Sequence, residues 1–320
     1  MPSSTSNSDK GTAASREPAG PVLLLTIVLL FLSGVETITR IAFDRVSRIQ
    51  QRTSREWQAA IAPPSANARL LIIIGNSLLG AGVDPEKLRR EAAPALDVRR
   101  LVVEDTEYLD WYYGIRRMFA EGGKPDVVAV VTTASGLMER RIRGDYSARY
   151  LMLFADIPAA ARAVGADRNR TGSMFLASIS GFWGARVEIR KWMLGMLLPE
   201  TQEWFRTLAW KPSPPVGSDA RARSVEQQLM QLKELVSSHG AELWLIAPPS
   251  LGSPDMTQIL QRAGHRAGVR VLVPLAAGRL GPDFFADGFH LTPRGAAVFT
   301  TALVSAIRDS TKNPAAAEAP

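Results

Sequence analysis

The longest uninterrupted apolar stretch of the chain lies near its start. Residues 19–35 carry no charge and consist largely of Leu, Val and Ile, and the apolar character continues to Phe43. A segment of this length can cross the hydrocarbon core of a bilayer, about 30 Å, as a slightly tilted helix. A cleaved signal peptide is the nearest alternative, but Glu36 and Arg40 stand where a cleavage site would be expected. We predict a polar, disordered leader over 1–18 and an uncleaved signal anchor over 19–43.

Short runs rich in Ile, Val and Leu follow, each separated from the next by sequence with helical periodicity. The runs predict strands buried on both faces at 69–75, 98–103, 126–133, 242–247 and 269–273. Helices are predicted at 84–95, 109–120, 224–238, 255–267 and 293–308. The alternation predicts an α/β fold, a three-layer α/β/α sandwich around a five-stranded parallel sheet. Sites in such sheets form at the carboxyl ends of strands, so we expect chemistry after the first strand.

Three further segments complete the predicted organisation. Residues 44–66 predict an amphipathic stalk followed by a linker at Pro63–Pro64, and residues 310–320 predict a disordered tail after a main domain over 67–309. The third and fourth strands are too far apart for a simple βαβ unit, which predicts a helical insertion over about 144–220.

This predicted insertion is rich in Arg and holds four of the seven Trp, which are Trp183, Trp192, Trp204 and Trp210. A helical subdomain with its own core is the plainer interpretation. The functional interpretation is a lid over the site, or a face docked on the bilayer or on a membrane partner.

Charge and composition exclude several classes of function. The net charge of +7 suits anionic partners, but the basic residues form no run and no stripe with aromatic residues, so we predict no nucleic-acid partner. The absence of Cys excludes disulfides and thiol nucleophiles. The sequence predicts no metal site, because it has only three His and no H-E-x-x-H motif. It also predicts no cofactor, because it contains neither G-x-x-x-x-G-K-[ST] nor G-x-G-x-x-G, the motifs that bind nucleotide phosphates.

Two separated motifs could work together as a site. Gly75-Asn76-Ser77-Leu78 directly follows the first predicted strand, where a Ser is held on a tight turn beside backbone N–H groups. Asp287 and His290 lie just before the last predicted helix, three residues apart. That spacing lets the carboxylate reach Nδ1 of the imidazole and leaves Nε2 to take a proton from a hydroxyl. Each motif alone is also explained by helix capping or a surface loop.

The pair of motifs resembles the SGNH (GDSL-type) hydrolase superfamily over residues 69–309, apart from the insertion. The resemblance implies an SGNH/flavodoxin-like sandwich in which Ser77 is the nucleophile, His290 the general base and Asp287 its orienting partner. It also implies oxyanion donors at the Ser77 backbone and, where the family has Asn, at Ser135. The sequence departs from the family at Asn76, which replaces an Asp, and at residues 103–107, which contain no Gly.

Other polar residues near these motifs have plainer interpretations. Glu104, Asp105 and Glu107 predict a solvated approach to a helix and not a pair of glycosidase carboxylates. The aromatic cluster at 110–113 is typical of core packing on the sheet.

The whole arrangement resembles the anchored SGNH-like proteins that work beside membrane-bound O-acyltransferases in decorating bacterial cell-surface polysaccharides. This implies a serine O-acetyltransferase or esterase that acts on an exopolysaccharide or other acyl ester. Its partners would be a membrane-bound O-acyltransferase and the lipid bilayer. Two alternatives stay open: a membrane-tethered carboxylesterase or lipase, and a catalytically impaired scaffold or glycan-binding component.

The implied function favours a single-pass protein of the inner (cytoplasmic) membrane with its main domain outside the cytoplasm. The charges beside the anchor favour the opposite orientation. Two basic residues precede the anchor, and Arg40, Arg45, Arg48, Arg52 and Arg55 follow its apolar core, so the positive-inside rule would keep the main domain in the cytoplasm.

Overall fold

The sheet is parallel throughout and has five strands. A computed structural model of the chain describes residues 19–43, 48–65, 68–197, 218–251 and 255–312. The strands are β1 (Arg69–Gly75), β2 (Leu96–Val102), β3 (Val127–Val131), β4 (Glu242–Ile246) and β5 (Arg270–Leu272). They pair in the order β2-β1-β3-β4-β5, with every pair parallel. The predicted five-stranded parallel sheet is confirmed, and the strand order reverses direction at β1.

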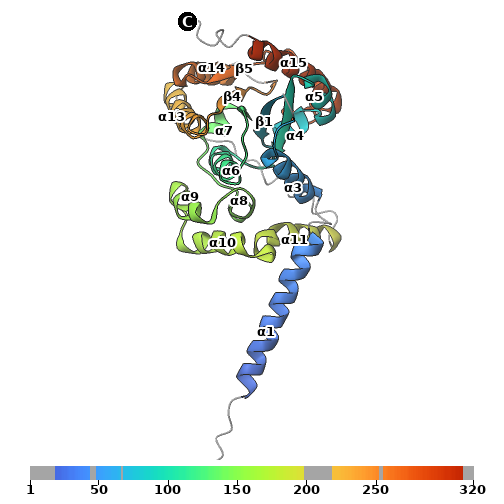
Figure 1. Cartoon of the computed structure of the whole chain (residues 1–320), viewed down its shortest axis with the longest axis vertical. Helices are drawn as coiled ribbons and strands as arrows, with labels where there is room; N and C mark the ends of the chain where they lie inside the picture. Colours follow the sequence, from blue (N-terminus) through green and yellow to red (C-terminus); the bar gives the residue numbers. More distant parts are fainter. Residues whose placement is uncertain (1–18, 44–47, 66–67, 198–217, 252–254, 313–320) are drawn as a thin grey trace, which may run out of the picture.

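Helices cover both faces of this sheet (Figure 1). Leu70, Ile72 and Ile74 of β1 pack on one face with α6 (Tyr108–Ala120), α13 (Ser218–Ser237) and α14 (Asp255–Ala267). Leu71 and Ile73 pack on the other face with α4 (Ser77–Gly82), α5 (Pro85–Ala92) and α15 (Pro293–Lys312). Successive residues of a strand point to opposite faces, so the uninterrupted apolar run of β1 fills two cores. The three-layer sandwich is confirmed.

The aromatic cluster at 110–113 contributes to the first of these cores, as expected. Trp111 and Tyr113 are buried there. Helix α15 extends to Lys312, so residues 310–312 are helical and not part of a disordered tail. The rest of that tail, 313–320, and the leader over 1–18 lie outside the described residues.

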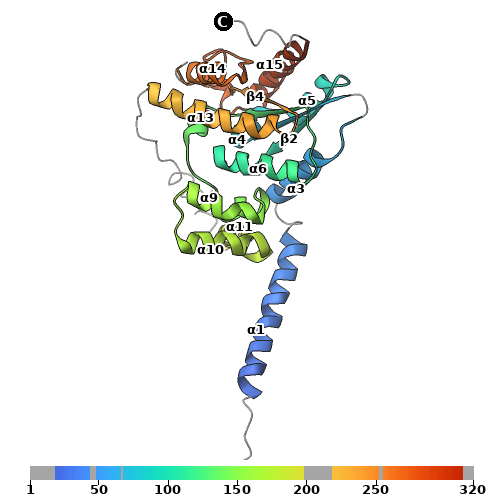
Figure 2. The ribbon, with the colours of Figure 1, turned by 60° about the vertical axis from the view of Figure 1, so that its left-hand side comes forward.

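The predicted insertion contains a stack of helices between β3 and β4. After α7 (Ala134–Met138) come α8 (Asp145–Tyr150), a 3₁₀ turn η2 (Phe154–Asp156), α9 (Ile157–Ala163), α10 (Arg168–Ile179) and α11 (Gly181–Leu197). Residues 198–217, with Trp204 and Trp210, lie outside the described part of the chain. Figure 2 shows α10 and α11 as the outer layer of the body, at the end where α1 leaves it.

The N-terminal segment forms α1 (Ala19–Ile38), a π-helical turn η1 (Thr39–Phe43) and α3 (Arg48–Ile61). One helix among the described residues, Gly20–Ile41, is long and apolar enough to cross a membrane by length and composition, as a signal sequence near the N-terminus also would be. Helix α3 differs from the expected stalk because it packs against the domain. Trp57 and Ala60 are buried there, and Glu56 pairs with Arg100 of β2.

Candidate active site

Ser77 is placed by a tight connection between β1 and α4. Gly75 ends the strand, and a side chain there would meet Leu79 Cβ at 2.9 Å and the Val131 carbonyl oxygen at 3.1 Å. Asn76 caps α4 by accepting a hydrogen bond from the Leu78 N–H at 3.0 Å. Ser77 is therefore the first helical residue, at the carboxyl end of β1 and at the switch point of the sheet.

His290 lies in a loop that is closed by its own hydrogen bonds. Asp287 Oδ1 accepts from the backbone N–H groups of Phe289, at 3.3 Å, and His290, at 2.8 Å. Gly288 has φ +90°, a left-handed conformation that side chains rarely adopt. The Ala286 N–H donates to the His290 carbonyl at 2.7 Å, which completes the turn.

The structure brings Ser77, Asp287 and His290 together as one hydrogen-bonded relay. Asp287 Oδ2 lies 2.7 Å from His290 Nδ1, and His290 Nε2 lies 2.8 Å from Ser77 Oγ, across 213 residues of sequence. Because Nδ1–H donates to the carboxylate, Nε2 is left to accept the hydroxyl proton. This arrangement can move a proton from Ser77 to His290, which is the first requirement of a serine nucleophile.

The Asp287 end of the relay is open to solvent. The Asp287 side chain is 46% exposed and that of His290 is 26% exposed. Partial burial alone would raise the pKa of Asp287, but hydrogen bonds from the His290 side chain and backbone outweigh it and lower the pKa below its usual value. Asp287 is therefore a carboxylate at neutral pH. The exposed Phe289 ring lies against the imidazole, with centroids 4.3 Å apart.

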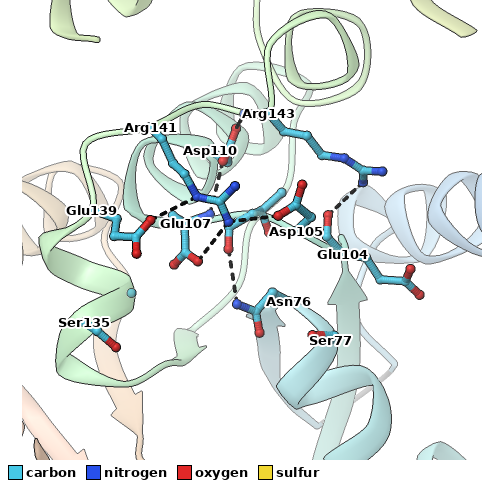
Figure 3. Close-up of polar contacts among 12 residues, drawn as sticks. Asn76, Ser77, Glu104, Asp105, Glu107, Asp110, Ser135, Glu139, Arg141 and Arg143 are labelled. Carbon is cyan, nitrogen blue, oxygen red and sulfur yellow. Dashed lines mark hydrogen bonds and ion pairs between the residues drawn. The ribbon is translucent and has the colours of Figure 1, made fainter. Parts of the chain in front are cut away.

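Ser135 is not brought into contact with this relay. It lies on α7, its hydroxyl is 2.8 Å from Thr133 Oγ1, and it lines a separate cavity of about 190 Å³. Figure 3 shows it well apart from Ser77. The Ser77 backbone N–H, in contrast, belongs to the first turn of α4, where no helical carbonyl can accept it. Of the two expected oxyanion donors, only that of Ser77 is at the relay.

The loop 104–107, which follows β2, lies beside the turn that holds Ser77 (Figure 3). The Asn76 amide donates to the Thr106 carbonyl at 3.2 Å and so ties this loop to the turn that holds Ser77. Asp105 has φ +56° and so adopts a left-handed conformation that favours glycine. The backbone here therefore turns as a glycine would, although the sequence has none.

The expectation that the acidic residues of this loop are all solvated is wrong for Glu107. Its side chain is 13% exposed, whereas those of Glu104 and Asp105 are 38% and 61% exposed. Burial raises the pKa of Glu107 to about 7, although the nearby Arg141 guanidinium opposes the shift. Arg141 contacts Asp105 at 2.8 Å, Glu107 at 3.3 Å and Glu139 at 3.0 Å, as Figure 3 shows.

Asp110 and Arg143 join this loop to the helical insertion. Asp110 is buried and accepts hydrogen bonds from the Glu107 N–H, the Arg143 N–H and the Ser147 hydroxyl. Burial raises its pKa to about 6 against the lowering effect of these hydrogen bonds. The Arg143 guanidinium donates to the Glu104 carbonyl at 2.7 Å and to Glu188 of α11 at 3.2 Å. A cavity of about 550 Å³ lies beside these contacts. It is lined by Asp105, Arg141 and Arg143 and by residues of α10 and α11.

Sequence reasoning missed this second side of the site almost completely. The contacts of Asn76 with Thr106, of Arg141 with Asp105 and of Arg143 with Glu188 join residues 30 to 45 positions apart, although Glu107 and Asp110 are only three positions apart. The sequence gives one weak signal of the left-handed backbone at position 105, which is that Asp is among the residues that tolerate this conformation. Within the described residues, no group of three His, Asp or Glu is placed to hold a metal ion.

Comparisons with known proteins find similarity at the level of structure. No family model and no curated protein matches the chain. A structure of TesA is 10% identical with a TM-score of 0.38, and the match covers 75% of this chain and 99% of that one. A putative acylhydrolase from Bacteroides fragilis is 10% identical with a TM-score of 0.40, over 82% and 97% of the two chains.

A third similar structure is a catalytic mutant of Axe2, an acetylxylan esterase from Geobacillus stearothermophilus. It is 13% identical with a TM-score of 0.39, and the match covers 77% of this chain and 95% of that one. Because these identities and scores are low, the chemistry of this chain is inferred from its own residues.

Proposed function

We propose that this chain is a serine enzyme that cleaves acyl esters, with Ser77 as nucleophile, His290 as general base and Asp287 as its orienting partner. The observation that supports it best is the continuous relay of 2.7 Å and 2.8 Å between three residues that the chain brings together from its two ends. A capping serine or a surface histidine needs no such partner.

The proposed reaction has two halves. In the first, Ser77 Oγ attacks the acyl carbon while His290 Nε2 takes its proton, and the ester oxygen leaves with that proton as an alcohol. Asp287 holds the imidazole in the required orientation and stabilises its positive charge. In the second half, His290 activates a hydroxyl that attacks the acylated Ser77 and releases the acyl group. The Ser77 N–H, in the first turn of α4, is the donor for the developing oxyanion.

Water is the favoured acceptor in the second half. Transfer to a sugar hydroxyl requires that water be excluded, whereas the Asp287 and His290 side chains are 46% and 26% exposed. We therefore place hydrolysis of an acyl ester first, with acetyl groups on a cell-surface polysaccharide as the substrate class.

Transfer of an acetyl group to such a polysaccharide is the second candidate, and a specific observation favours it. The 550 Å³ cavity lies between the loop 104–107 and the helices next to α1. A donor delivered by a membrane-bound O-acyltransferase would approach from that side.

The proposed location is a membrane, held by α1. Its exposed apolar side chains, among them Leu23, Leu30 and Phe31, support this proposal. The function on a surface polysaccharide requires the domain to lie outside the cytoplasm, against the distribution of basic residues around α1. A reporter fused after residue 320 would decide between the two orientations.

The enzymatic proposal is tested with the full chain in detergent micelles. We expect a fluorophosphonate probe to label it and a chromogenic acetyl ester to be turned over, with both signals lost in Ser77→Ala and His290→Ala. Ser305→Ala, an exposed serine on α15, is the matched control and should behave as the native chain does. Adding glycan acceptors then separates hydrolysis from transfer. Folded protein with no labelling and no turnover would overturn the proposal in favour of a scaffold or glycan-binding role.

A further inference from the structure

Exposed apolar side chains outside α1 and the π-helical turn after it are concentrated on the helical insertion. Among the described residues, those of α10 and α11 are Leu176, Ile179, Phe182, Val187, Trp192, Met193, Met196 and Leu197. The other helices and loops of the domain expose such residues singly, for example Met230 on α13 and Val298 on α15. Isolated exposed residues are normal, but a cluster of this size marks an interaction surface.

The cluster follows the helical period on both helices. On α11, the exposed Phe182, Met193 and Met196 and the half-buried Ile189 between them recur at spacings of seven, four and three residues, which places them on one face. On α10, Leu176 and Ile179 share a face at a spacing of three. The opposite sides of the two helices pack inward, where Met174, Ala177 and Gly184 are buried. We call the exposed side, defined by Leu176, Ile179, Phe182, Met193 and Met196, the contact face.

Helix α1 is joined directly to this contact face. The Glu36 carboxylate accepts hydrogen bonds from the N–H groups of Gly181, at 2.6 Å, and Phe182, at 3.1 Å, and so caps the start of α11. Arg40 donates to the Ile179 carbonyl at 2.6 Å, at the end of α10. The junction between α10 and α11 is therefore fixed to the last turn of α1, and the contact face begins where the apolar helix ends.

The direction of these helices fits a lipid surface. Figures 1 and 2 both show α10 and α11 running across the direction of α1. The two helices lie on the side of the body from which α1 extends. A helix in that direction, with apolar residues on its outer side, lies in the plane of the membrane surface with those residues in the boundary between headgroups and acyl chains. The exposed Trp192, Arg168 and Arg190 on these helices suit that boundary, because the indole is amphipathic and guanidinium groups pair with phosphate.

We propose that the contact face of α10 and α11 binds the bilayer surface around α1, with lipid as its occupant. The inference rests on the proposed anchoring by α1 and goes beyond it, since an anchor alone would leave the domain free to tilt. A membrane-protein partner is the other possible occupant. Lipid is favoured because any bilayer crossed by α1 must lie beside residues fixed to its last turn, whether or not a partner is present.

The absence of cysteine makes a direct test simple, because each introduced Cys is the only site for a thiol-reactive label. Ile179→Cys, Met193→Cys and Met196→Cys report on the contact face, Leu29→Cys reports on α1, and Met230→Cys on α13 is the control. All five positions are exposed, so the substitutions do not disturb the core. The full chain, labelled with an environment-sensitive fluorophore, is reconstituted alone into vesicles of phosphatidylethanolamine and phosphatidylglycerol, and quenching by nitroxide-bearing lipids is measured.

We expect blue-shifted emission and loss of more than about half of it at 179, 193 and 196, as for side chains inserted into the headgroup boundary. A nitroxide near the headgroup should quench these positions best, and one near the end of the acyl chain should quench position 29 best. Position 230 should remain unquenched. Water-like emission at the three contact-face positions with strong quenching at 29 would overturn the proposal and assign the face to a protein partner.

The same measurement separates this inference from the anchoring itself. Quenching at the contact face without quenching at 29 would support the face and contradict a spanning α1. No quenching at any position would contradict both. As a second variant, Ile179→Glu in the Met196→Cys chain should remove quenching at 196 without changing the folded domain, because position 179 is 59% exposed.

Discussion

The two sides of the candidate site are built in opposite ways. The side that carries Asp287 and His290 is a short, solvent-exposed loop, and the hydrogen bonds that orient His290 within it come from Asp287 and Ala286, no more than four positions away. The side formed by the loop 104–107 is partly buried and is held by Arg141 and Arg143, 36 and 39 positions from their partners, and by Asp110 of the adjoining helix α6. The first side depends on local geometry, and the second depends on the folded core and the insertion.

The difference indicates where each kind of damage should appear. Changes in the relay should reduce activity and leave the fold intact, because its groups make few contacts outside the loop. Changes in the loop 104–107 and its partners should act first on the free energy of unfolding. The following variants test that division.

The largest effect is expected from the relay itself. His290→Ala removes the base whose Nε2 lies 2.8 Å from Ser77 Oγ, and we expect kcat for an acetyl ester to fall by about 10⁴-fold or more. The thermal midpoint of unfolding should stay within a few degrees of the native value. A large loss of stability in this variant would contradict the view of the loop as structurally independent.

A smaller loss is expected from Asp287→Asn. The amide keeps the size of the side chain but cannot stabilise the imidazolium, which points to a fall in kcat of about 10²–10⁴-fold. The lower part of that range is favoured here, since the carboxylate is 46% exposed and water can replace part of its effect. Asp283→Asn, on an exposed residue of the preceding turn, is the matched control. Equal kinetics for the two variants would show that Asp287 has no role in orientation.

On the other side of the site, Asp110→Ala should act on stability. It leaves the Glu107 and Arg143 N–H groups and the Ser147 hydroxyl without their buried acceptor. We expect the free energy of unfolding in denaturant to fall by about 3–5 kcal/mol. Asp309→Ala, an exposed position on α15, should change it by less than about 0.5 kcal/mol.

The smallest effect is a pH dependence due to Glu107. Its pKa is raised to about 7 from an ordinary 4.5, so between these values the unfolded chain loses a proton that the folded chain keeps. Stability contributed by this group is therefore lost as pH rises from about 4.5 to 7, by at most about 3 kcal/mol. Glu107→Gln cannot titrate, so the variant should gain stability relative to the native chain over that window. Parallel unfolding curves across the window would contradict the shift.

The sequence predicted the parts of the molecule that depend on local pattern. The strand at 69–75 is predictable because a continuous apolar run is required by burial on both faces. The approach of Asp287 to His290 is predictable from spacing, and the place of Ser77 follows from its position after β1.

The remaining parts depend on distant packing and could not be predicted. Glu107 is buried because Gly136 and Arg141 close over it, and nothing in residues 104–107 indicates this. Ser135 follows its strand at the expected position, but α7 turns its hydroxyl toward Thr133. Helix α3 has an amphipathic pattern that suits a free stalk equally well, and its place is decided by distant contacts, such as Glu56 with Arg100 of β2 and Trp57 with Glu121 at the end of α6.

The separation of Ser77 and His290 by 213 residues has a consequence for the order of synthesis. Domains generally begin to fold from the N-terminus while the ribosome is still at work. Here β1 and Ser77 emerge early, but the imidazole arrives only with the final helix α15, which also covers α4 and α5. The nascent chain therefore holds Ser77 without its proposed base until residue 290 has been made. Proteolytic loss of the segment that carries His290 would return the chain to that state.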